Sequence, residues 1–519
     1  MRASLLILVL TGLMACQGSV KDITVIRQAS NPHFPPLDSI SGLDGEQLSY
    51  IYCQQCHQYP EPQFLKSEQW EDGVLPRMGH RLGIWKSRSE AVQGLDMMEE
   101  YLVNQANIYP KEPMISEEAW NKLKNYYLSH ASKNTTQLTF PQNSSRQFEA
   151  HQRRLNNDIP LLTMLDYDEK SGQLHIGLRN DQLWIEDEER TIKKITTTGP
   201  PISRIKQNNK YAHVLSMGIM DPSNQAKGML YRAFGDSLQA IAGELRRPVH
   251  LLSHDINEDG EDDLLISEFG NDIGQLSAVL LKKGRPYKKQ VLIPEPGARK
   301  TIAYDWNQDG KEDLLVLMAQ GDERIVLLEK EEAGLYREKT LLRFPPVYGS
   351  SYFELADFNG DGLKDIVYVN GDNADYSYAL KPYHGIRIFL NREEETPKEA
   401  YFFPFYGATE AVAWDFDQDG DMDIAGIAYF GNFEGNAASG AVYLENTTKE
   451  KGLTFQPMQI PEASSGRWLT MEVADTDHDG DEDLLLGSCV LVRTPVPDTL
   501  KTYWEQEGAS ILHLENKLK

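Results

Sequence analysis

Basic residues are scarce in this chain: 52 lysines and arginines stand against 78 aspartates and glutamates, giving a net charge of −26. Affinity for nucleic acid comes largely from Lys and Arg on phosphates, so this balance argues against a nucleic-acid partner. Beyond the N-terminal segment, no apolar run is long enough to cross a membrane. The sequence also lacks a serine elbow, a phosphate-binding loop, a dinucleotide fingerprint and an H-E-x-x-H zinc signature.

The chain nevertheless has the material for well-packed domains. Hydrophobic residues make up 40% and aromatic residues 9% of its 519 positions, which is not a disordered composition. A chain of this length is too long for one ordinary core. We therefore expect two or three domains.

The first residues, MRASLLILVLTGLMAC, have the composition of an export signal. Arg2 gives a positive start, and the apolar run that follows is shorter than the roughly 20 residues that span a bilayer. The run ends in LMAC, which resembles the lipobox of bacterial lipoproteins. This resemblance implies removal of residues 1–15, lipid attachment to Cys16 and a tether over 16–40, with a plain secretory signal as the alternative. We expect an exported protein, in the periplasm or at the cell surface, that is held at a bacterial membrane only by lipid.

Cys53, Cys56 and His57 form C-x-x-C-H, the spacing of a c-type haem attachment site. Two thiols at this spacing add to the haem vinyl groups, and the adjacent histidine ligates the iron. A zinc site would need a second ligand pair, and the sequence has no second C-x-x-C. A redox C-x-x-C would need a surrounding βαβ pattern, which is missing. The prediction is haem c, with a disulfide as the main alternative, while Cys489 in its apolar run is predicted to be a buried thiol.

The residues around C-x-x-C-H have helical patterns. Asp44 suits the N-cap of a helix over 44–57, and Ser116 suits that of the last helix of the region. Residues 87–104 are also expected to be helical. The arrangement resembles a class I cytochrome c, which implies a small all-α haem domain over residues 41–132.

A methionine is the expected sixth ligand of a cytochrome c iron. Met78 lies 21 residues after His57 and resembles the Trp-then-Met pattern of small bacterial cytochrome c domains. Met114, just before the last helix, is the alternative ligand. Met97 and Met98 lie within a helical pattern and are expected in the core.

A polar segment over 133–150 is predicted to be a linker, and beyond it the sequence repeats. Five stretches share the pattern Asp-x-(Asn/Asp)-x-Asp-Gly-x-x-Asp, and each is followed by an apolar strand. They begin at Asp255, Asp305, Asp357, Asp415 and Asp475. This spacing fits one four-stranded propeller blade per repeat.

The pattern has the chemistry of a calcium loop. Side chains at positions 1, 3, 5 and 9 and a backbone carbonyl near position 7 can converge on one cation, and the glycine at position 6 permits a sharp turn. Such oxygen ligands suit Ca²⁺, and we expect it to act mainly as a structural staple; a catalytic or sensing metal is the alternative. The predicted ligand positions are Asp255, Asn257, Asp259, Glu261 and Asp263; Asp305, Asn307, Asp309, Lys311 and Asp313; Asp357, Asn359, Asp361, Leu363 and Asp365; Asp415, Asp417, Asp419, Asp421 and Asp423; and Asp475, Asp477, Asp479, Asp481 and Asp483.

These repeats resemble the FG-GAP (VCBS) repeats of integrin-type β-propellers. Phe269-Gly270-Asn271 and Phe430-Gly431-Asn432 match the dipeptide that names the repeat. The resemblance implies an all-β propeller over residues 151–519. Residues 161–178, with Asp166 and Asp168, and residues 211–234 read as two further blades without calcium loops. We therefore expect seven blades, with six or eight as the alternatives.

Residues 370–391 depart from the repeat and hold Asp372, Asp375, Tyr376, Tyr378, Lys381, Tyr383 and His384. Long polar and aromatic propeller loops often build a binding face, whereas packing on the next blade is the plain alternative. The stretch also resembles a segment of bacterial proteins that join a cytochrome-like domain to such a propeller.

Together these features predict an electron-transfer protein with a c-type haem and a calcium-bound propeller. The propeller would dock a redox partner protein, or a glycan or protein ligand. Two other hypotheses stay open: a propeller dehydrogenase that passes electrons from a sugar or alcohol to its own haem, and a surface binding module. Fold alone cannot choose among them, because propellers host many functions.

Overall fold

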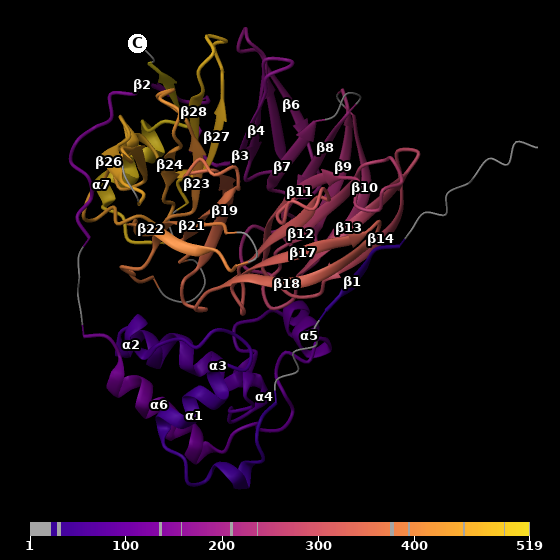
Figure 1. Ribbon diagram of the computed structural model, residues 1–519, viewed down its shortest axis with the longest axis vertical. Helices are drawn as coiled ribbons and strands as arrows, with labels where there is room; N and C mark the ends of the chain where they lie inside the picture. Colours follow the sequence, from indigo (N-terminus) through magenta and orange to yellow (C-terminus); the bar gives the residue numbers. More distant parts are fainter. Residues whose placement is uncertain are drawn as a thin grey trace, which may run out of the picture.

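The computed structural model describes residues 22–27, 33–133, 138–156, 158–207, 211–235, 237–373, 378–392, 395–449, 452–491 and 494–517. The predicted signal and Cys16 therefore lie outside the described residues. A small helical region (residues 33–132) lies below a large β-propeller, as Figure 1 shows. None of the described helices has the length and apolar character needed to cross a membrane.

The helical region is built from short helices around one apolar cluster. Leu48, Trp70, Trp120, Leu123 and Tyr127 are almost fully buried in this cluster. The helical elements are η1 (Leu37–Ile40), α1 (Gly45–Cys53), η2 (Pro62–Phe64), α2 (Ser67–Gln69), the π-helical turn η3 (Trp70–Val74), α3 (Leu75–Arg81), α4 (Arg88–Ala91), α5 (Met97–Gln105) and α6 (Glu117–His130).

Both predicted helix caps are confirmed. Asp44 accepts a hydrogen bond from the Gln47 amide at 2.9 Å, and the Gln47 side chain accepts one from the Asp44 amide, which completes a capping box. The Ser116 hydroxyl accepts from the Ala119 amide at 3.2 Å. These contacts satisfy amides that the first helical turn would otherwise leave unpaired.

The prediction of one continuous helix over 87–104 is wrong, because the segment forms two helices. Gly94 has a φ of +88°, and Asp96 caps a new helix by accepting from the Met98 and Glu99 amides. The segment therefore forms α4 and α5 with a turn between them. Met97 and Met98, which we expected in the core, are 89% and 53% exposed.

The propeller has seven four-stranded antiparallel blades, as predicted. Each blade runs from an inner strand outward, and the inner strands contact one another around the central axis. Blades 1 to 3 are β3 (Leu162–Asp168), β4 (Gln173–Leu178), β5 (Gln182–Glu186) and β6 (Ile192–Thr196); β7 (Ile202–Gln207), β8 (Ala212–Ser216), β9 (Gly228–Phe234) and β10 (Ser237–Leu245); and β11 (Pro248–His254), β12 (Asp263–Glu268), β13 (Gln275–Lys282) and β14 (Arg285–Ile293).

The remaining blades continue the same order. Their outer strands carry the polar surface, while second strands such as β16 are buried along their whole length. Blades 4 to 6 are β15 (Ala298–Tyr304), β16 (Asp313–Met318), β17 (Arg324–Glu332) and β18 (Leu335–Arg343); β19 (Ser350–Ala356), β20 (Asp365–Asn370), β21 (Gly385–Leu390) and β22 (Lys398–Pro404); and β23 (Glu410–Trp414), β24 (Asp423–Ile427), β25 (Ala441–Asn446) and β26 (Phe455–Gln459).

Blade 7 joins the two ends of the propeller sequence. Its inner strands are β27 (Trp468–Ala474), β28 (Asp483–Ser488) and β29 (Ile511–Asn516), and its outer strand is β2 (Phe148–Arg153). Helix α7 (Asp498–Gln506) lies between β28 and β29. Residues 148–150, which the sequence suggested as linker, are thus the start of the strand that closes the ring.

Part of the predicted tether is also a strand. β1 (Thr24–Ile26) pairs in parallel with β18 and adds a fifth strand to blade 4, seen along its outer edge in Figure 1. Ile23 is buried in the apolar core shared by blades 3 and 4. The N-terminal segment therefore runs along the propeller before it enters the helical region.

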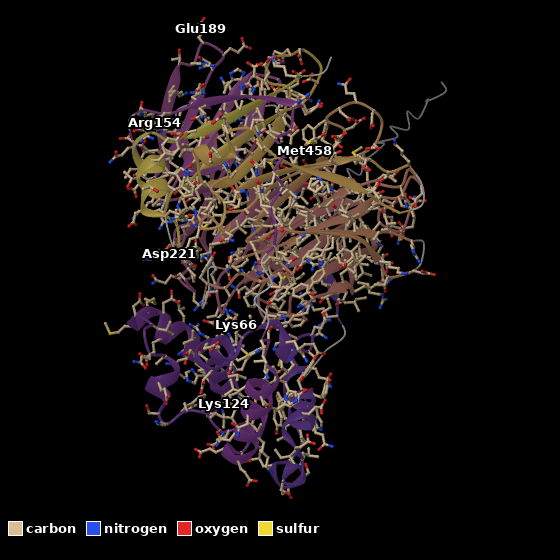
Figure 2. The ribbon with its side chains drawn as sticks, turned by 90° about the vertical axis from the view of Figure 1, so that its left-hand side faces the viewer. Lys66, Lys124, Arg154, Glu189, Asp221 and Met458 are labelled. Carbon is tan, nitrogen blue, oxygen red and sulfur yellow. The ribbon has the colours of Figure 1, made fainter. Side chains whose placement is uncertain are left out.

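The two faces of the propeller carry different loops. Loops between first and second strands lie on one face, and loops between second and third strands lie on the opposite face, because neighbouring strands are antiparallel. We call the second one the docking face, since it meets the helical region. In Figure 2, Asp221 in the loop after β8 lies toward that region, whereas Glu189 in the turn before β6 lies at the far end.

Candidate functional site

The C-x-x-C-H residues lie at the end of helix α1. Cys53 is the last residue of the helix, and the three residues after it form a turn that leads to His57. Both thiols are free, with Cys53 half-buried and Cys56 exposed. Burial raises the pKa of the Cys53 thiol to about 12 and also raises that of Cys56, so both favour the neutral thiol.

The His57 ring has the orientation that a metal ligand needs. Its Nδ1 lies 2.9 Å from the carbonyl oxygen of Gln58. When Nδ1–H donates to this carbonyl, the lone pair of Nε2 is available to bind a metal. Burial lowers the pKa of His57, which favours the neutral imidazole that ligates.

Both candidate methionines lie in the helical region. Met78, in α3, is half-buried against the same apolar cluster as Cys53. Met114 is also half-buried, and two hydrogen bonds hold its backbone. Its amide donates to the Leu82 carbonyl at 2.8 Å, and its carbonyl accepts from the Tyr52 hydroxyl at 3.1 Å. The two thioethers therefore stay alternatives. The donor set of two thiols, a free imidazole nitrogen and a thioether fits a c-type haem in its chemistry.

The C-x-x-C-H segment lies close to the docking face. The charges of Asp322 and Arg343, both from blade 4, act on the pKa values of Cys56 and His57, as does that of Arg81 in α3. Arg81 also forms an ion pair at 2.5 Å with Asp272, in the loop between β12 and β13. The propeller is therefore part of the surroundings of the predicted haem site.

Two further contacts fix the helical region on the docking face. The buried carboxylate of Glu99, in α5, accepts hydrogen bonds from the Ser223 hydroxyl and from the Asn224 amide. The Phe64 ring packs edge-on against Tyr348 and Tyr383, with centroids 5.6 and 5.2 Å away. Apolar and polar contacts thus act together at this interface.

The 370–391 stretch comprises the loop between β20 and β21 on the docking face (residues 371–384) and strand β21 itself. Asp375 and Tyr376 lie outside the described residues. Tyr383 stacks on Tyr348 at 5.1 Å, and Lys381 donates to the Val347 carbonyl at 3.2 Å. His384 is fully buried. Around Tyr383 the stretch therefore packs against the helical region.

The five Asp loops, residues 255–263, 305–313, 357–365, 415–423 and 475–483, share one conformation. Each connects the first and second strands of its blade, on the face opposite the helical region. In every loop the first aspartate accepts from the glycine amide at position 6, at 2.8 to 3.1 Å. The glycines have φ values between +85° and +99°, which residues with a Cβ rarely adopt.

The ninth residue of each Asp loop ties the loop to the outer half of its blade. Each of these aspartates accepts a hydrogen bond at 2.7 to 2.8 Å from a backbone amide. That amide lies near the end of the third strand of the blade or just after it. Burial raises the pKa to about 7 in Asp263 and Asp423 and to about 6 in Asp313 and Asp365. In Asp483 burial also raises the pKa, but bonds from His513 and Thr476 outweigh it and lower the value.

Several carboxylate oxygens in the Asp loops suit a cation. Asp415, Asp417 and Asp419 place one oxygen each within 4.8 Å of one another, and so do the equivalent residues of the last loop, Asp475, Asp477 and Asp479. Among the described residues, Asp263 Oδ2, Asp415 Oδ1 and Asp421 Oδ1 are buried without a hydrogen-bond partner. Buried carboxylate oxygens of this kind fit Ca²⁺.

The other loops are less acidic. Loops 255–263, 305–313 and 357–365 have an asparagine at position 3, and in the second of these the Lys311 ammonium lies 3.4 Å from Asp309. In blade 1, Asp166 lies 3.1 Å from His175 and Asp168 accepts from the Ser171 hydroxyl at 2.6 Å, so both carboxylates there have protein partners.

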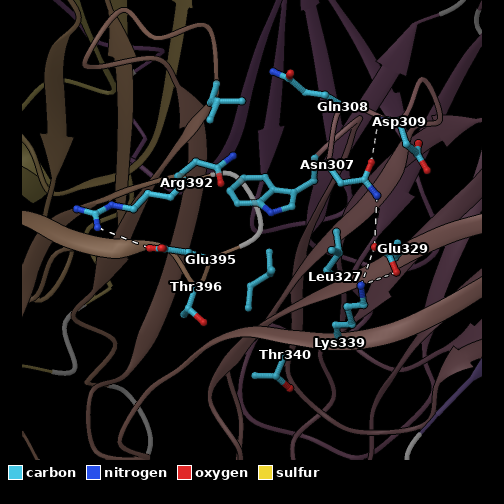
Figure 3. A pocket seen from close by; sticks show the side chains of 14 residues that line it. Asn307, Gln308, Asp309, Leu327, Glu329, Lys339, Thr340, Arg392, Glu395 and Thr396 are labelled. Carbon is cyan, nitrogen blue, oxygen red and sulfur yellow. Dashed lines mark hydrogen bonds and ion pairs between the residues drawn. The ribbon is translucent and has the colours of Figure 1, made fainter.

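A polar groove of about 640 Å³ lies between blades 4 and 5, beside the second Asp loop. Figure 3 shows Asn307 and Lys339 both directed toward Glu329, while Arg392 pairs with Glu395 on the other side. Trp306 and Leu341 supply apolar lining. Sequence reasoning missed this groove, because its walls come from two blades.

A charged cluster in the inner strands was also missed. Its members lie at inner-strand positions of blades 2, 4, 5, 6 and 7: Arg204, Arg299, Lys300, Glu354, Glu410 and Glu472. The signal available in the sequence was a charged residue inside each of these strands, where a packed core alone would favour apolar side chains.

A family model and several solved structures are similar to this chain. A family model described as an FG-GAP-like repeat matches residues 305–368 and 415–486. No curated protein sequence matches the chain. A streptogramin B lyase structure has 11% identity and a TM-score of 0.45, covering 71% of this chain and 98% of its own.

Two other solved structures are similarly distant. The N-terminal domain of Nup159 has 10% identity and a TM-score of 0.39, covering 72% of this chain and 97% of its own. A luciferin-regenerating enzyme has 9% identity and a TM-score of 0.37, covering 71% and 95%. Likenesses at this level carry no argument about function. The matched repeats and the blade topology together show that the chain contains FG-GAP repeats within a seven-bladed β-propeller.

Proposed function

We propose that this protein is an electron-transfer protein that carries a covalent c-type haem in its helical region. Cys53 and Cys56 would hold the porphyrin, His57 the iron, and Met78 or Met114 the sixth position. The observation that carries the proposal is the His57 ring, whose Nδ1 lies against the Gln58 carbonyl while Nε2 stays available. When bound, the haem supplies one-electron chemistry.

The residues around this site would control access and polarity. The apolar cluster around Trp70, Leu75 and Tyr127 excludes water from one side of the C-x-x-C-H segment. Asp322 and Arg343 of the docking face place charges beside His57. Such charges and burial are among the factors that set a haem potential.

Calcium in the Asp loops would serve as a structural staple of the propeller. Each loop joins the first and second strands of a blade, and its ninth residue reaches the outer strands. An ion between the carboxylates would offset their mutual repulsion and fix the turn. This proposal extends to all five loops, with the strongest support in loops 415–423 and 475–483.

The N-terminal sequence supports export and lipid attachment at Cys16, which would place the protein at a bacterial membrane. A redox partner protein would then meet it in the periplasm or at the cell surface. The described strand β1 begins eight residues after Cys16, and so the anchor would enter close to the outer edge of blade 4.

Covalent attachment is tested by haem staining on a denaturing gel, after expression in an exporting host that matures c-type cytochromes. We expect staining of the full chain and none of the Cys53→Ala/Cys56→Ala variant. Cys489→Ala is the matched control, because this third cysteine is buried in the propeller. Equal staining of the wild type and the double variant, or none of either, would refute the proposal.

A binding module is the second candidate, supported by the FG-GAP repeats and by the groove between blades 4 and 5. On this account the groove takes a glycan or protein ligand. A glycan-array or pull-down signal that Lys339→Ala abolishes, and that persists without haem, would support it. A signal unaffected by this change would place the binding elsewhere.

A further inference from the structure

Charged side chains from non-neighbouring blades meet in the central channel of the propeller. The channel cluster consists of Arg204, Arg299, Lys300, Glu354, Glu410 and Glu472. Burial lowers the pKa of Arg204, in blade 2, but Tyr352 in blade 5, Glu410 in blade 6 and Glu472 in blade 7 outweigh burial and raise it. Blades 2 and 6 are not adjacent in the ring, so this influence runs across the channel.

Only part of the channel cluster is paired within the protein. The Lys300 ammonium donates to Glu354 at 2.8 Å and to the Tyr352 hydroxyl at 2.6 Å. By contrast, the guanidinium groups of Arg204 and Arg299 make no direct hydrogen bond or ion pair with any residue that the structure describes. Both arginines are half-buried.

The two unpaired guanidinium groups also repel each other. Burial lowers the pKa of Arg299, and the charge of Arg204 lowers it further, while Glu410 and Tyr352 oppose the change. Each guanidinium offers five N–H donors in a planar fork that matches a carboxylate. Two such forks, partly withdrawn from water and without a direct hydrogen-bonded partner, can both donate to one anion placed between them.

We propose that the central channel binds a small monocarboxylate that carries hydroxyl groups, such as a sugar acid. Its carboxylate would lie between Arg204 and Arg299, and its hydroxyl groups would face Tyr352, Glu410 and Glu472. The acidic side of the channel makes a dianion such as phosphate a poorer fit. The site lies in the propeller and does not depend on the proposed haem.

Burial also shifts the acidic side of the channel toward its neutral form. Burial, together with the charge of Asp166, raises the pKa of Glu472 to about 8, and burial also raises that of Glu410. Because Lys300 is paired to Glu354, the two guanidinium groups are the cations of the cluster that face a bound anion.

The test is isothermal titration calorimetry of the full chain with D-glucuronate and D-gluconate. The two control ligands are D-glucose, which has the hydroxyl groups but no carboxylate, and inorganic phosphate, which is an anion without a sugar. We expect binding of at least one acid and neither control. Arg204→Gln and Arg299→Gln should each weaken binding by about 30-fold or more, as expected for the loss of one partner of a desolvated charge pair. Arg204→Lys, which keeps the charge but not the fork, should retain part of the affinity.

The control variant is Arg285→Gln, at an exposed position on the outer strand β14, which should bind as the wild type does. Both channel variants should fold, because no direct protein contact is lost, and their circular dichroism should match the wild type. Failure of both acids to bind, equal binding of phosphate, or unchanged affinity in both Gln variants would overturn the proposal.

Discussion

Glu99 shows how one side chain can join two parts of a chain. Its carboxylate is buried and meets the Ser223 hydroxyl and the Asn224 amide, more than 120 residues away. Glu99→Ala should lower the free energy of unfolding by about 1–3 kcal/mol, because two buried donors lose their acceptor. Denaturant unfolding measures the change.

Glu100→Ala is the matched control, because Glu100 is exposed on the same helix. We expect it to stay within about 0.5 kcal/mol of the wild type. Equal effects of the two substitutions would mean that the Glu99 contacts do not hold the interface.

The haem spectrum distinguishes Met78 from Met114 as the sixth ligand. If Met78 is the sixth ligand, Met78→Ala should abolish the low-spin six-coordinate spectrum, because the thioether is lost while both thiols stay in place. The haem should remain covalently attached. Absorbance spectroscopy reads out the change, and Met114→Ala is its control. A spectrum altered only by Met114→Ala would assign the ligand to that residue instead.

Glu323 should make stability depend on pH. Burial raises its pKa to about 7, although Ser350 and the Gly349 amide donate to it. The folded state thus keeps a proton that the unfolded state releases near pH 4.5. This contribution to stability is present at low pH and is lost as the pH rises to about 7.

Melting temperatures at pH 5 and pH 8 test this. In Glu323→Gln, which cannot ionise, the fall between the two pH values should be smaller than in the wild type. Glu71→Gln, at an exposed position, should leave the fall unchanged. If the melting temperature of Glu323→Gln falls between pH 5 and pH 8 as much as that of the wild type, other groups produce the pH dependence.

At the scale of single elements, the Asp loops should respond to calcium. Chelation by EGTA should lower the melting temperature, because the loop carboxylates then repel one another. Asp415→Asn and Asp475→Asn should reduce the difference between calcium-loaded and chelated protein. Asp168→Asn, in the matching loop of blade 1, should not, since Asp168 already accepts a hydrogen bond from the Ser171 hydroxyl there. An equal calcium effect in all three variants would rule out loops 415–423 and 475–483 as the main sites.

Elements with a strong local signal could be predicted from the sequence. The Asp44 and Ser116 caps, the seven blades and the buried Cys489 all follow from residues close together in the chain. The glycine at position 6 of each Asp loop likewise has a positive φ in all five loops.

Elements that depend on distant partners could not be predicted. Residues 24–26 form a strand only because β18 offers a free edge. Met97 and Met98 have a helical pattern, but α5 directs Glu99 and Val103 inward and leaves these methionines exposed. The channel cluster needs the ring geometry, which no single repeat contains.

At the scale of the whole molecule, ring closure depends on contacts between the two ends of the propeller sequence. The Asn516 side chain donates to the Phe416 carbonyl at 2.8 Å, and Gln147 donates to the same carbonyl at 3.0 Å. Phe416 belongs to the Asp loop 415–423. Calcium in this loop would therefore stabilise the closure as well as its own blade.

The overall arrangement separates the two proposed metal centres. The C-x-x-C-H segment lies by the docking face, and the Asp loops lie on the opposite face. Neither position could be read from the sequence, because the direction of each loop depends on strand order in the ring. Calcium should therefore affect stability far more than it affects the haem.

The central claim is that the helical region carries a redox-active c-type haem. The most direct measurement is the dithionite-reduced minus oxidised absorbance spectrum of the full chain from a maturation-competent exporting host, beside Cys53→Ala/Cys56→Ala. The account predicts a sharp reduced α-band of a c-type haem in the wild type and none in the variant. A wild-type protein without that band would contradict it and leave a propeller-based binding protein.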